Sequence, residues 1–316
     1  MKAVLIGNYG VGNFGDEALK EYFLRAFPTV SWTTLSAHPG EGELPRLPIG
    51  FRSFARTPWW KTLGAIRHSD TVVFGGGTLF TDIESVRACM LWGVHAFVAW
   101  LLGVPYHLSF QGVGPFTTRV GEVIARWVVY RATTFSVRDE ASYDRVVCWA
   151  KRSDLVRTFD PVFALFVATK RLHQPSGAYV LIPRHNSGAA FYAALDAHAT
   201  NLRHASIVVA LFQPDDPGER RAVESVRRRY PNASVRIIRH VDDIMELLGT
   251  ASHCITERFH GALAAVAAEV PLSIVSQAEG DKLSMVSHMF GRPDGRSTAL
   301  ADIQKGEEAL RMALKR

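Results

Sequence analysis

Cysteine is scarce in this 316-residue chain, and its scarcity excludes several classes of protein. The three cysteines, Cys89, Cys148 and Cys254, are scattered, odd in number and form no CxxC pair. This pattern argues against a disulfide framework and against a zinc site, and it fits a reduced cytosol. No other metal-ligand cluster is visible, so we expect no bound metal. The opening apolar run is too short for a secretory signal, which favours a cytoplasmic protein, with the inner face of the membrane as an alternative.

Acidic and basic residues are absent from the stretch 88–118. Two histidines, Gly93, Gly103 and Pro105 interrupt this stretch, and a membrane-spanning helix needs a longer continuous apolar run. The pattern instead predicts a buried helix at about 84–102, followed by a central strand at 106–110.

Arginine supplies most of the formal net charge of +6, and part of it is concentrated between Glu219 and His240. One interpretation is a solvated helix face followed by a strand. The other is a surface that attracts phosphates or lipid headgroups, which keeps peripheral association with a membrane open. Aromatic residues are not interleaved with these arginines and no nucleic-acid motif occurs, so we expect no nucleic-acid partner.

Short apolar runs alternate with helical segments along the whole chain. The runs lie at 3–6, 30–35, 71–74, 106–110, 133–137, 155–159, 179–183, 206–211, 234–238, 253–255 and 272–275. This alternation predicts an α/β protein with two doubly wound Rossmann-like domains facing a cleft. A polar break at 168–177 separates them, so we expect an N-terminal domain at 1–168 and a C-terminal domain at 177–290. We expect residues 291–316 to form a helical segment that packs back on the N-terminal domain.

Four glycines lie in the loop 7–15, between the first predicted strand and a helix that starts near Asp16. Glycines let the backbone approach a ligand closely, and a helix N-terminus attracts anions. The loop contains Gly10-x-Gly12-x-x-Gly15, which matches the dinucleotide fingerprint in spacing. In that fingerprint the first glycine follows the strand directly, whereas here Asn8 and Tyr9 intervene after Gly7. In addition, no carboxylate follows the second strand at Ser36-Ala37-His38. We therefore expect neither an NAD site nor another resident cofactor.

The predicted strand ends differ between the two halves. In the first half, glycine clusters follow the strands at 7–15, 75–77 and 112–114. In the second half, Arg184 follows one strand and Arg258 with His260 follows another. Ligands of such sheets bind beyond the carboxyl ends of the strands. The pattern therefore predicts a sugar-like acceptor on the first domain and an anionic donor on the second.

Six motifs occur in the order used by one family. They are Gly10-x-Gly12-Asn13-x-Gly15-Asp16-Glu17-Ala18, Gly75-Gly76-Gly77-Thr78-Leu79-Phe80-x-Asp82, Gln111-Gly112-Val113-Gly114-Pro115, Ser136-Val137-Arg138-Asp139, Asp160-Pro161-Val162-Phe163 and Arg258-Phe259-His260-Gly261. Together they resemble the polysaccharide pyruvyl transferase family over about residues 5–282. The resemblance implies a fold similar to the GT-B glycosyltransferases, with phosphoenolpyruvate as co-substrate. It also implies that the pyruvyl group becomes a ketal on a saccharide or lipid-linked saccharide, in cell-surface polysaccharide biosynthesis.

The resemblance also implies roles for cationic residues. Arginine binds carboxylates and phosphates bidentately, as the donor requires. The positions that match the family's donor-binding cations are Arg184, Arg258, Lys282 and Arg138.

Ketal formation needs a proton at the donor methylene and activation of the attacking hydroxyls. Histidine titrates near neutrality, so we expect His260 to act as acid/base or phosphate partner, unless it is a structural histidine. We expect Asp16 to activate or orient an acceptor hydroxyl, unless it only caps its helix. The residues expected on the saccharide side are Gly12, Asn13, Gly76, Gly77 and Gln111. Asn13 could equally stabilise its loop.

Two features depart from the family and leave other functions open. Phe259 replaces the usual aliphatic residue, and the chain is short for the family, with few residues for acceptor-specific loops. The main alternative is a GT-B glycosyltransferase that uses a nucleotide sugar, for which Glu257 is the candidate ribose-binding carboxylate. A third is an inactive sugar-binding or phosphate-binding scaffold, against which the intact Asp16, Arg258 and His260 argue.

Overall fold

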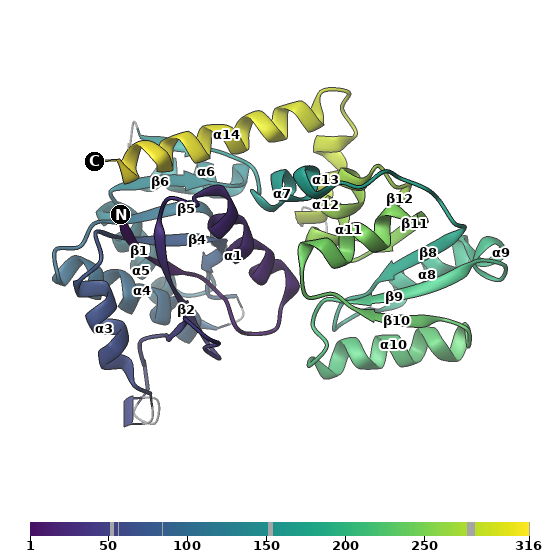
Figure 1. Cartoon of the computed structure of the whole chain (residues 1–316), viewed down its shortest axis with the longest axis horizontal. Helices are drawn as coiled ribbons and strands as arrows, with labels where there is room; N and C mark the ends of the chain where they lie inside the picture. The colour runs from purple at the N-terminus through teal and green to yellow at the C-terminus, as the bar shows by residue number, and fades with distance from the viewer. Residues whose placement is uncertain (51–53, 56, 84, 151–153, 277–281, 316) are drawn as a thin grey trace. The chain divides into compact units, whose positions relative to one another are not determined.

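The computed structural model describes residues 1–50, 54–55, 57–83, 85–150, 154–276 and 282–315 (Figure 1). The chain forms two compact units. The first comprises Met1–Val11, Leu19–Pro161 and Leu300–Arg316, and the second comprises Gly12–Ala18 and Val162–Ala299. The short segment Gly12–Ala18 therefore groups with the second unit, although the chain on both sides of it belongs to the first.

The first unit contains a parallel sheet with the strand order β3-β2-β1-β4-β5-β6-β7. Its strands are β1 (Lys2–Ile6), β2 (Ser31–Ser36), β3 (Leu44–Pro45), β4 (Thr71–Phe80), β5 (Tyr106–Val113), β6 (Thr134–Val137) and β7 (Leu155–Arg157). Parallel neighbours need crossover connections, which the helices between these strands supply. The strand order changes direction between β1 and β4, so helices cover both faces of the sheet.

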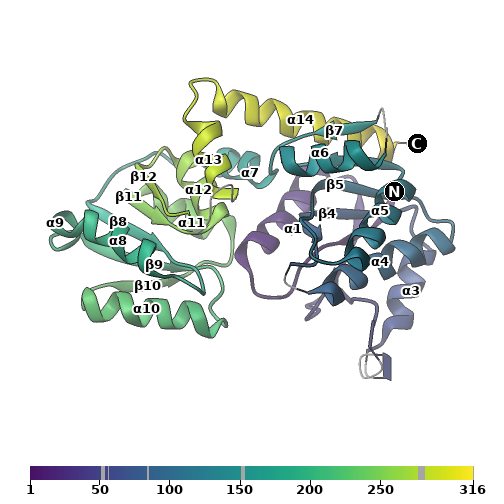
Figure 2. The ribbon, with the colours of Figure 1, turned by 180° about the vertical axis from the view of Figure 1, so that it is seen from behind.

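Helices lie on both faces of this sheet (Figures 1 and 2). One face carries α3 (Trp59–Arg67), α4 (Val86–Leu101), α5 (Arg119–Arg131) and α6 (Glu140–Trp149), and the other carries α1 (Phe14–Ala26) and α14 (Gly295–Leu314). The Tyr22 hydroxyl on α1 donates to Glu307 on α14 at 2.7 Å, and Arg311 donates to the Ala26 carbonyl. These contacts hold the end of the chain against the first unit.

The second unit contains a parallel sheet in the order β10-β9-β8-β11-β12. Its strands are β8 (Ala178–Ile182), β9 (Ser206–Leu211), β10 (Ser234–Ile237), β11 (Ala251–Thr256) and β12 (Leu272–Ile274). Its helices are α7 (Val162–Thr169), α8 (Ala189–Ala197), α9 (Ala199–Leu202), α10 (Pro217–Arg229), α11 (Val241–Gly249), α12 (Phe259–Ala268) and α13 (Lys282–Phe290). Strand β8 is buried along its length, as expected for a central strand with helices on both faces.

The predicted α/β class with two parallel sheets is confirmed, and each of the eleven predicted strands overlaps an observed one. Strand β3 was not predicted, because two residues make no recognisable apolar run. Strands β4 and β5 continue past the predicted ends at 74 and 110, so the glycines at 75–77 and 112 lie inside strands rather than after them.

The uncharged stretch 88–118 forms α4 and the fully buried strand β5, close to the predicted bounds. Across the described part of the chain, no helix combines the length and the apolar character needed to cross a membrane. The arginine-rich segment forms α10 and β10, and Arg227, Arg228 and Arg229 at the end of α10 are exposed. The segment thus forms a helix with an exposed basic end, followed by a strand.

Candidate active site

Arg184 and Arg258 follow neighbouring strands at the same edge of the second sheet. Strands β8 and β11 pair in a register that aligns Ile182 with Thr256, so the two strands end level with each other. Arg258 occupies the N-cap position of α12, where the positive end of the helix dipole favours an anion. The structure thus brings together the two arginines that the sequence predicted for the donor.

A buried carboxylate holds the Arg258 guanidinium. Glu219, in the first turn of α10, has no exposed surface and forms an ion pair with Arg258. The same carboxylate accepts hydrogen bonds from the backbone N–H groups of Phe212 (3.1 Å) and Gln213 (2.8 Å). A second bond runs from Arg258 Nη2 to Gln213 Oε1 at 3.3 Å. Sequence analysis missed Glu219 because it lies among arginines that indicate an exposed helix.

Electrostatics at Arg258 reflect this enclosure. Burial lowers the pKa of the Arg258 guanidinium to about 10, and the nearby charge of Arg184 acts in the same direction. Asp216 and Asp16 oppose this shift, which places the Asp16 carboxylate in the electrostatic surroundings of Arg258. Arg258 therefore stays charged at neutral pH.

The first turn of α1 belongs to the same site. The Phe14 N–H donates to the Phe212 carbonyl at 2.9 Å, and the Phe14 and Phe212 rings meet edge to face with centroids 4.5 Å apart. Asn13 Oδ1 accepts from the Gly15 N–H at 3.0 Å, so Asn13 stabilises its own loop and caps the helix. Asp16 lies in the first turn of α1, so its catalytic role and its role at the helix N-terminus both stay predictions.

The His260 ring lies against the backbone of Gly15. A Cβ atom added at Gly15 would lie 2.2 Å from His260 Nδ1 and 2.6 Å from Cε1, so only glycine fits beside this ring. His260 is half-buried in the first turn of α12. The two motifs that contain Gly15 and His260 are therefore neighbours in space, which places the predicted acid/base next to the first turn of α1.

Two further predicted residues of the second unit lie in different surroundings, one exposed and one buried. Lys282 is exposed at the start of α13, while the predicted segment 279–281 before it lies outside the described residues. Glu257 is buried, contacts the Ser187 hydroxyl and accepts from the Arg184 N–H at 3.3 Å. This carboxylate holds the Arg184 turn, so its surroundings give no support to a ribose-binding role.

Arg138 lies in the first unit, where it is buried and paired with the fully buried Asp160. It also donates to Thr78 Oγ1 at 3.0 Å. These contacts indicate a structural role, and donor binding by Arg138 stays a prediction without structural support.

The Arg138–Asp160 pair can be tested with Arg138→Met, which keeps most of the side-chain volume. We expect the free energy of unfolding to fall by about 3–5 kcal/mol, because Asp160 is left as a buried charge without its partner. The KM for the donor should not change. Chemical denaturation and steady-state kinetics measure the two effects, and a raised KM with unchanged stability would restore Arg138 to the donor site.

The predicted saccharide residues of the first unit are buried and tightly packed. A Cβ atom at Gly76 would lie 2.7 Å from the Leu19 side chain, and the Gln111 amide donates to the carbonyls of Phe74 (3.0 Å) and Gly76 (3.1 Å). Gly77 is also buried, within β4. These glycines make room for neighbouring side chains, so the prediction of an open backbone floor for a sugar is wrong for β4.

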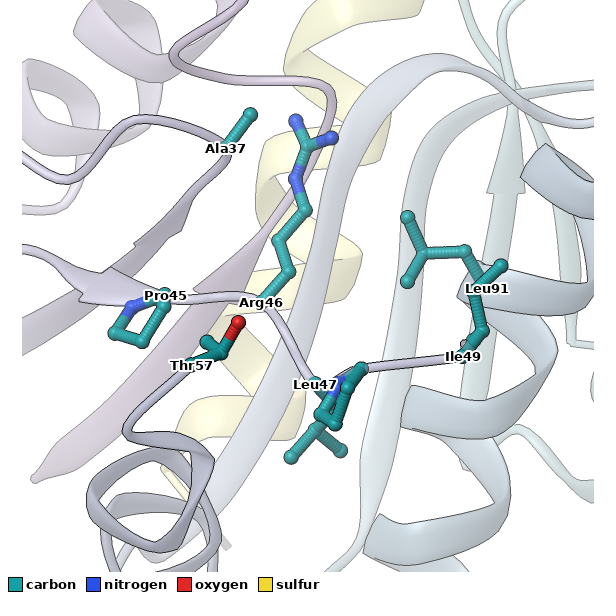
Figure 3. A pocket seen from close by; sticks show the side chains of 8 residues that line it. Ala37, Pro45, Arg46, Leu47, Ile49, Thr57 and Leu91 are labelled. Carbon is teal, nitrogen blue, oxygen red and sulfur yellow. The ribbon is translucent and has the colours of Figure 1, made fainter. Parts of the chain in front are cut away.

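A pocket of about 210 Å³ opens where β2 and β3 end in the first unit (Figure 3). Arg46 lines it, and its guanidinium donates to the Tyr9 carbonyl at 2.7 Å and lies over the Trp92 ring at 4.8 Å. Arg46 thus fixes the first part of the glycine loop. None of the predicted site residues lines this pocket.

The sequence profile of the polysaccharide pyruvyl transferase family matches residues 13–277, which include the first turn of α1, Arg184, Arg258 and His260. The chain belongs to this family. It is therefore a transferase of polysaccharide biosynthesis. A comparison with curated proteins found no match.

Solved structures confirm the GT-B-like fold of the transferase. HepE from Anabaena, solved in complex with UDP, is 11% identical with a TM-score of 0.59, and each chain is covered completely. UDP-GlcNAc 2-epimerase from Methanocaldococcus jannaschii is 12% identical with a TM-score of 0.60 and the same complete coverage. The Neisseria meningitidis enzyme, bound to UDP-GlcNAc, is 10% identical with a TM-score of 0.58, again over both whole chains. At these identities the likeness concerns the fold alone.

Proposed function

We propose that this transferase takes the pyruvyl group of phosphoenolpyruvate and places it as a ketal on two hydroxyls of a saccharide, free or lipid-linked. The proposal is based on one observation: Arg184 and Arg258 lie close together at one edge of the second sheet, beside the N-terminus of α12. A small donor with a carboxylate and a phosphate needs two cationic groups at close range. Lys282 is proposed as a further phosphate contact.

In the proposed reaction, each step moves one proton between named groups. His260 gives a proton to the methylene carbon, which becomes a methyl group, and positive charge develops at C2 of the donor. Asp16 orients one acceptor hydroxyl for attack at C2, and the proton of that hydroxyl passes to His260 and restores its acid form. The second hydroxyl then replaces the phosphate group, which leaves with the remaining proton. Arg184 and Arg258 offset the negative charge of the donor throughout.

Donor identity is the decisive test. We expect calorimetry to detect binding of phosphoenolpyruvate and not of UDP-hexose or GDP-hexose, because a cationic site fits the carboxylate and phosphate of a compact donor and Glu257 already holds the Arg184 turn. With candidate glycans, the enzyme should release phosphate and add a pyruvyl mass increment to the same glycan. If the protein binds a nucleotide hexose and does not bind phosphoenolpyruvate, the glycosyltransferase alternative replaces this proposal. No binding of either class would favour an inactive scaffold.

A further inference from the structure

Helices α4 and α5 expose several large apolar side chains on the first unit. The two helices lie side by side on one face of the sheet (Figure 2). Seven of their large apolar side chains are 41–72% exposed, and we call this surface the α4–α5 face. The seven are Met90, Phe97, Trp100, Leu101, Val120, Val123 and Tyr130. A soluble surface rarely gathers so many large apolar groups without a binding partner.

The aromatic rings of this face support one another. Trp127 on α5 is half-buried, and its ring centroid lies 5.9 Å from Phe97 and 5.7 Å from Trp100 on α4. These contacts cross the seam between the two helices. The rings are therefore held in place before any partner binds, and little side-chain entropy is lost on binding.

The two helices carry a net positive charge, and one of their arginines lies against the aromatic rings. Helices α4 and α5 carry four arginines and one glutamate, a formal charge of +3, and the glutamate pairs with Arg126 at 2.7 Å. The Arg131 guanidinium lies 5.3 Å from the centre of the Trp100 ring and 5.8 Å from that of Tyr130. Tryptophan, tyrosine and arginine together are typical of the interface between a membrane and water.

We propose that the α4–α5 face binds the surface of an anionic lipid bilayer. Exposed tryptophan and tyrosine would enter the headgroup layer, while the arginines contact lipid phosphates. A second copy of the chain is a less suitable partner than a bilayer. A dimer formed through this face would bring two positively charged surfaces into contact. The proposal does not depend on which donor the enzyme uses.

Vesicle sedimentation with the full chain tests the proposal. Wild-type protein should bind vesicles of equal parts phosphatidylcholine and phosphatidylglycerol, and more weakly in high salt or with phosphatidylcholine alone.

Phe97→Ser/Trp100→Ser should lower binding to both kinds of vesicle about tenfold or more. Arg126→Gln/Arg131→Gln should lower binding to the anionic vesicles about 30-fold and remove the lipid preference. Trp60→Ser, at an exposed tryptophan on α3, is the matched control and should bind like wild type.

Three outcomes would overturn the proposal. One is wild-type protein that ignores anionic vesicles, and another is a pair of folded variants that bind them as wild type does. The third is a wild-type dimer that the Phe97→Ser/Trp100→Ser change converts to monomer by light scattering, without vesicle binding in either form. That result would assign the α4–α5 face to contacts between copies. Far-ultraviolet circular dichroism and thermal unfolding establish that each variant is folded, as surface substitutions at exposed positions should allow.

Discussion

Arg258→Ala should abolish measurable turnover and weaken phosphoenolpyruvate binding by about 10- to 150-fold. The range follows from about 1.5–3 kcal/mol for a hydrogen bond to a charged group. Phosphate release and calorimetry measure the two effects. The same change leaves the buried Glu219 carboxylate without its cation, so the free energy of unfolding should also fall by about 3–5 kcal/mol.

A second substitution separates these two consequences. In Arg258→Ala/Glu219→Gln the amide oxygen still accepts from the Phe212 and Gln213 N–H groups, but no buried charge remains. We expect this variant to recover part of the lost stability and none of the activity. Arg292→Ala, at an exposed arginine of the same unit, should resemble wild type in both respects. Recovery of turnover in the double variant would show that Arg258 does not bind the donor and that its role is structural.

His260→Ala should lower turnover by about 100-fold or more, the usual effect of removing a general acid or base. Gly15→Ala should act through the same histidine, because the new methyl group would lie 2.2 Å from Nδ1 and must displace the ring. Gly15 is in the first turn of α1 at a φ that alanine adopts without strain, so the helix itself should not be weakened. Steady-state turnover and thermal unfolding of both variants measure the effects.

Gly64→Ala is the matched control for Gly15→Ala. Gly64 lies within α3, and a Cβ atom there meets nothing within 4 Å, so stability should rise slightly and activity should not change. If Gly15→Ala retains near-normal turnover, the position of His260 is not important for catalysis. A large loss of thermal stability in His260→Ala would instead identify a structural histidine.

Much of the fold could be predicted because buried parallel strands are continuous apolar runs. The runs located eleven strands, and the uncharged stretch 88–118 gave the correct helix and strand. The predicted strand ends before Arg184 and Arg258 were also correct, because a charged residue after a buried apolar run is typical of the end of a strand.

Other features depend on contacts between distant parts of the chain. Glycines 75–77 were expected to form an open floor, but the Tyr9 hydroxyl would lie 2.4 Å from a Cβ at Gly75 and Leu19 covers Gly76. A glycine that exposes backbone and a glycine that makes room for a neighbour have the same local sequence. The sequence likewise did not indicate that Arg138 pairs with Asp160 inside the first unit, and its donor role stays a prediction.

The amino-acid sequence by itself determined the α/β class, the family and the location of Arg184, Arg258 and His260 near strand ends, because these follow from local patterns. Only the tertiary structure placed the first turn of α1 beside His260 and grouped Gly12–Ala18 with the second unit. It alone also identified Glu219 as the partner of Arg258, 39 positions away in the chain (258 minus 219). The physical reason is that burial and charge pairing depend on which surfaces meet in space. The residues next to a position in the sequence do not indicate which distant residues will contact it.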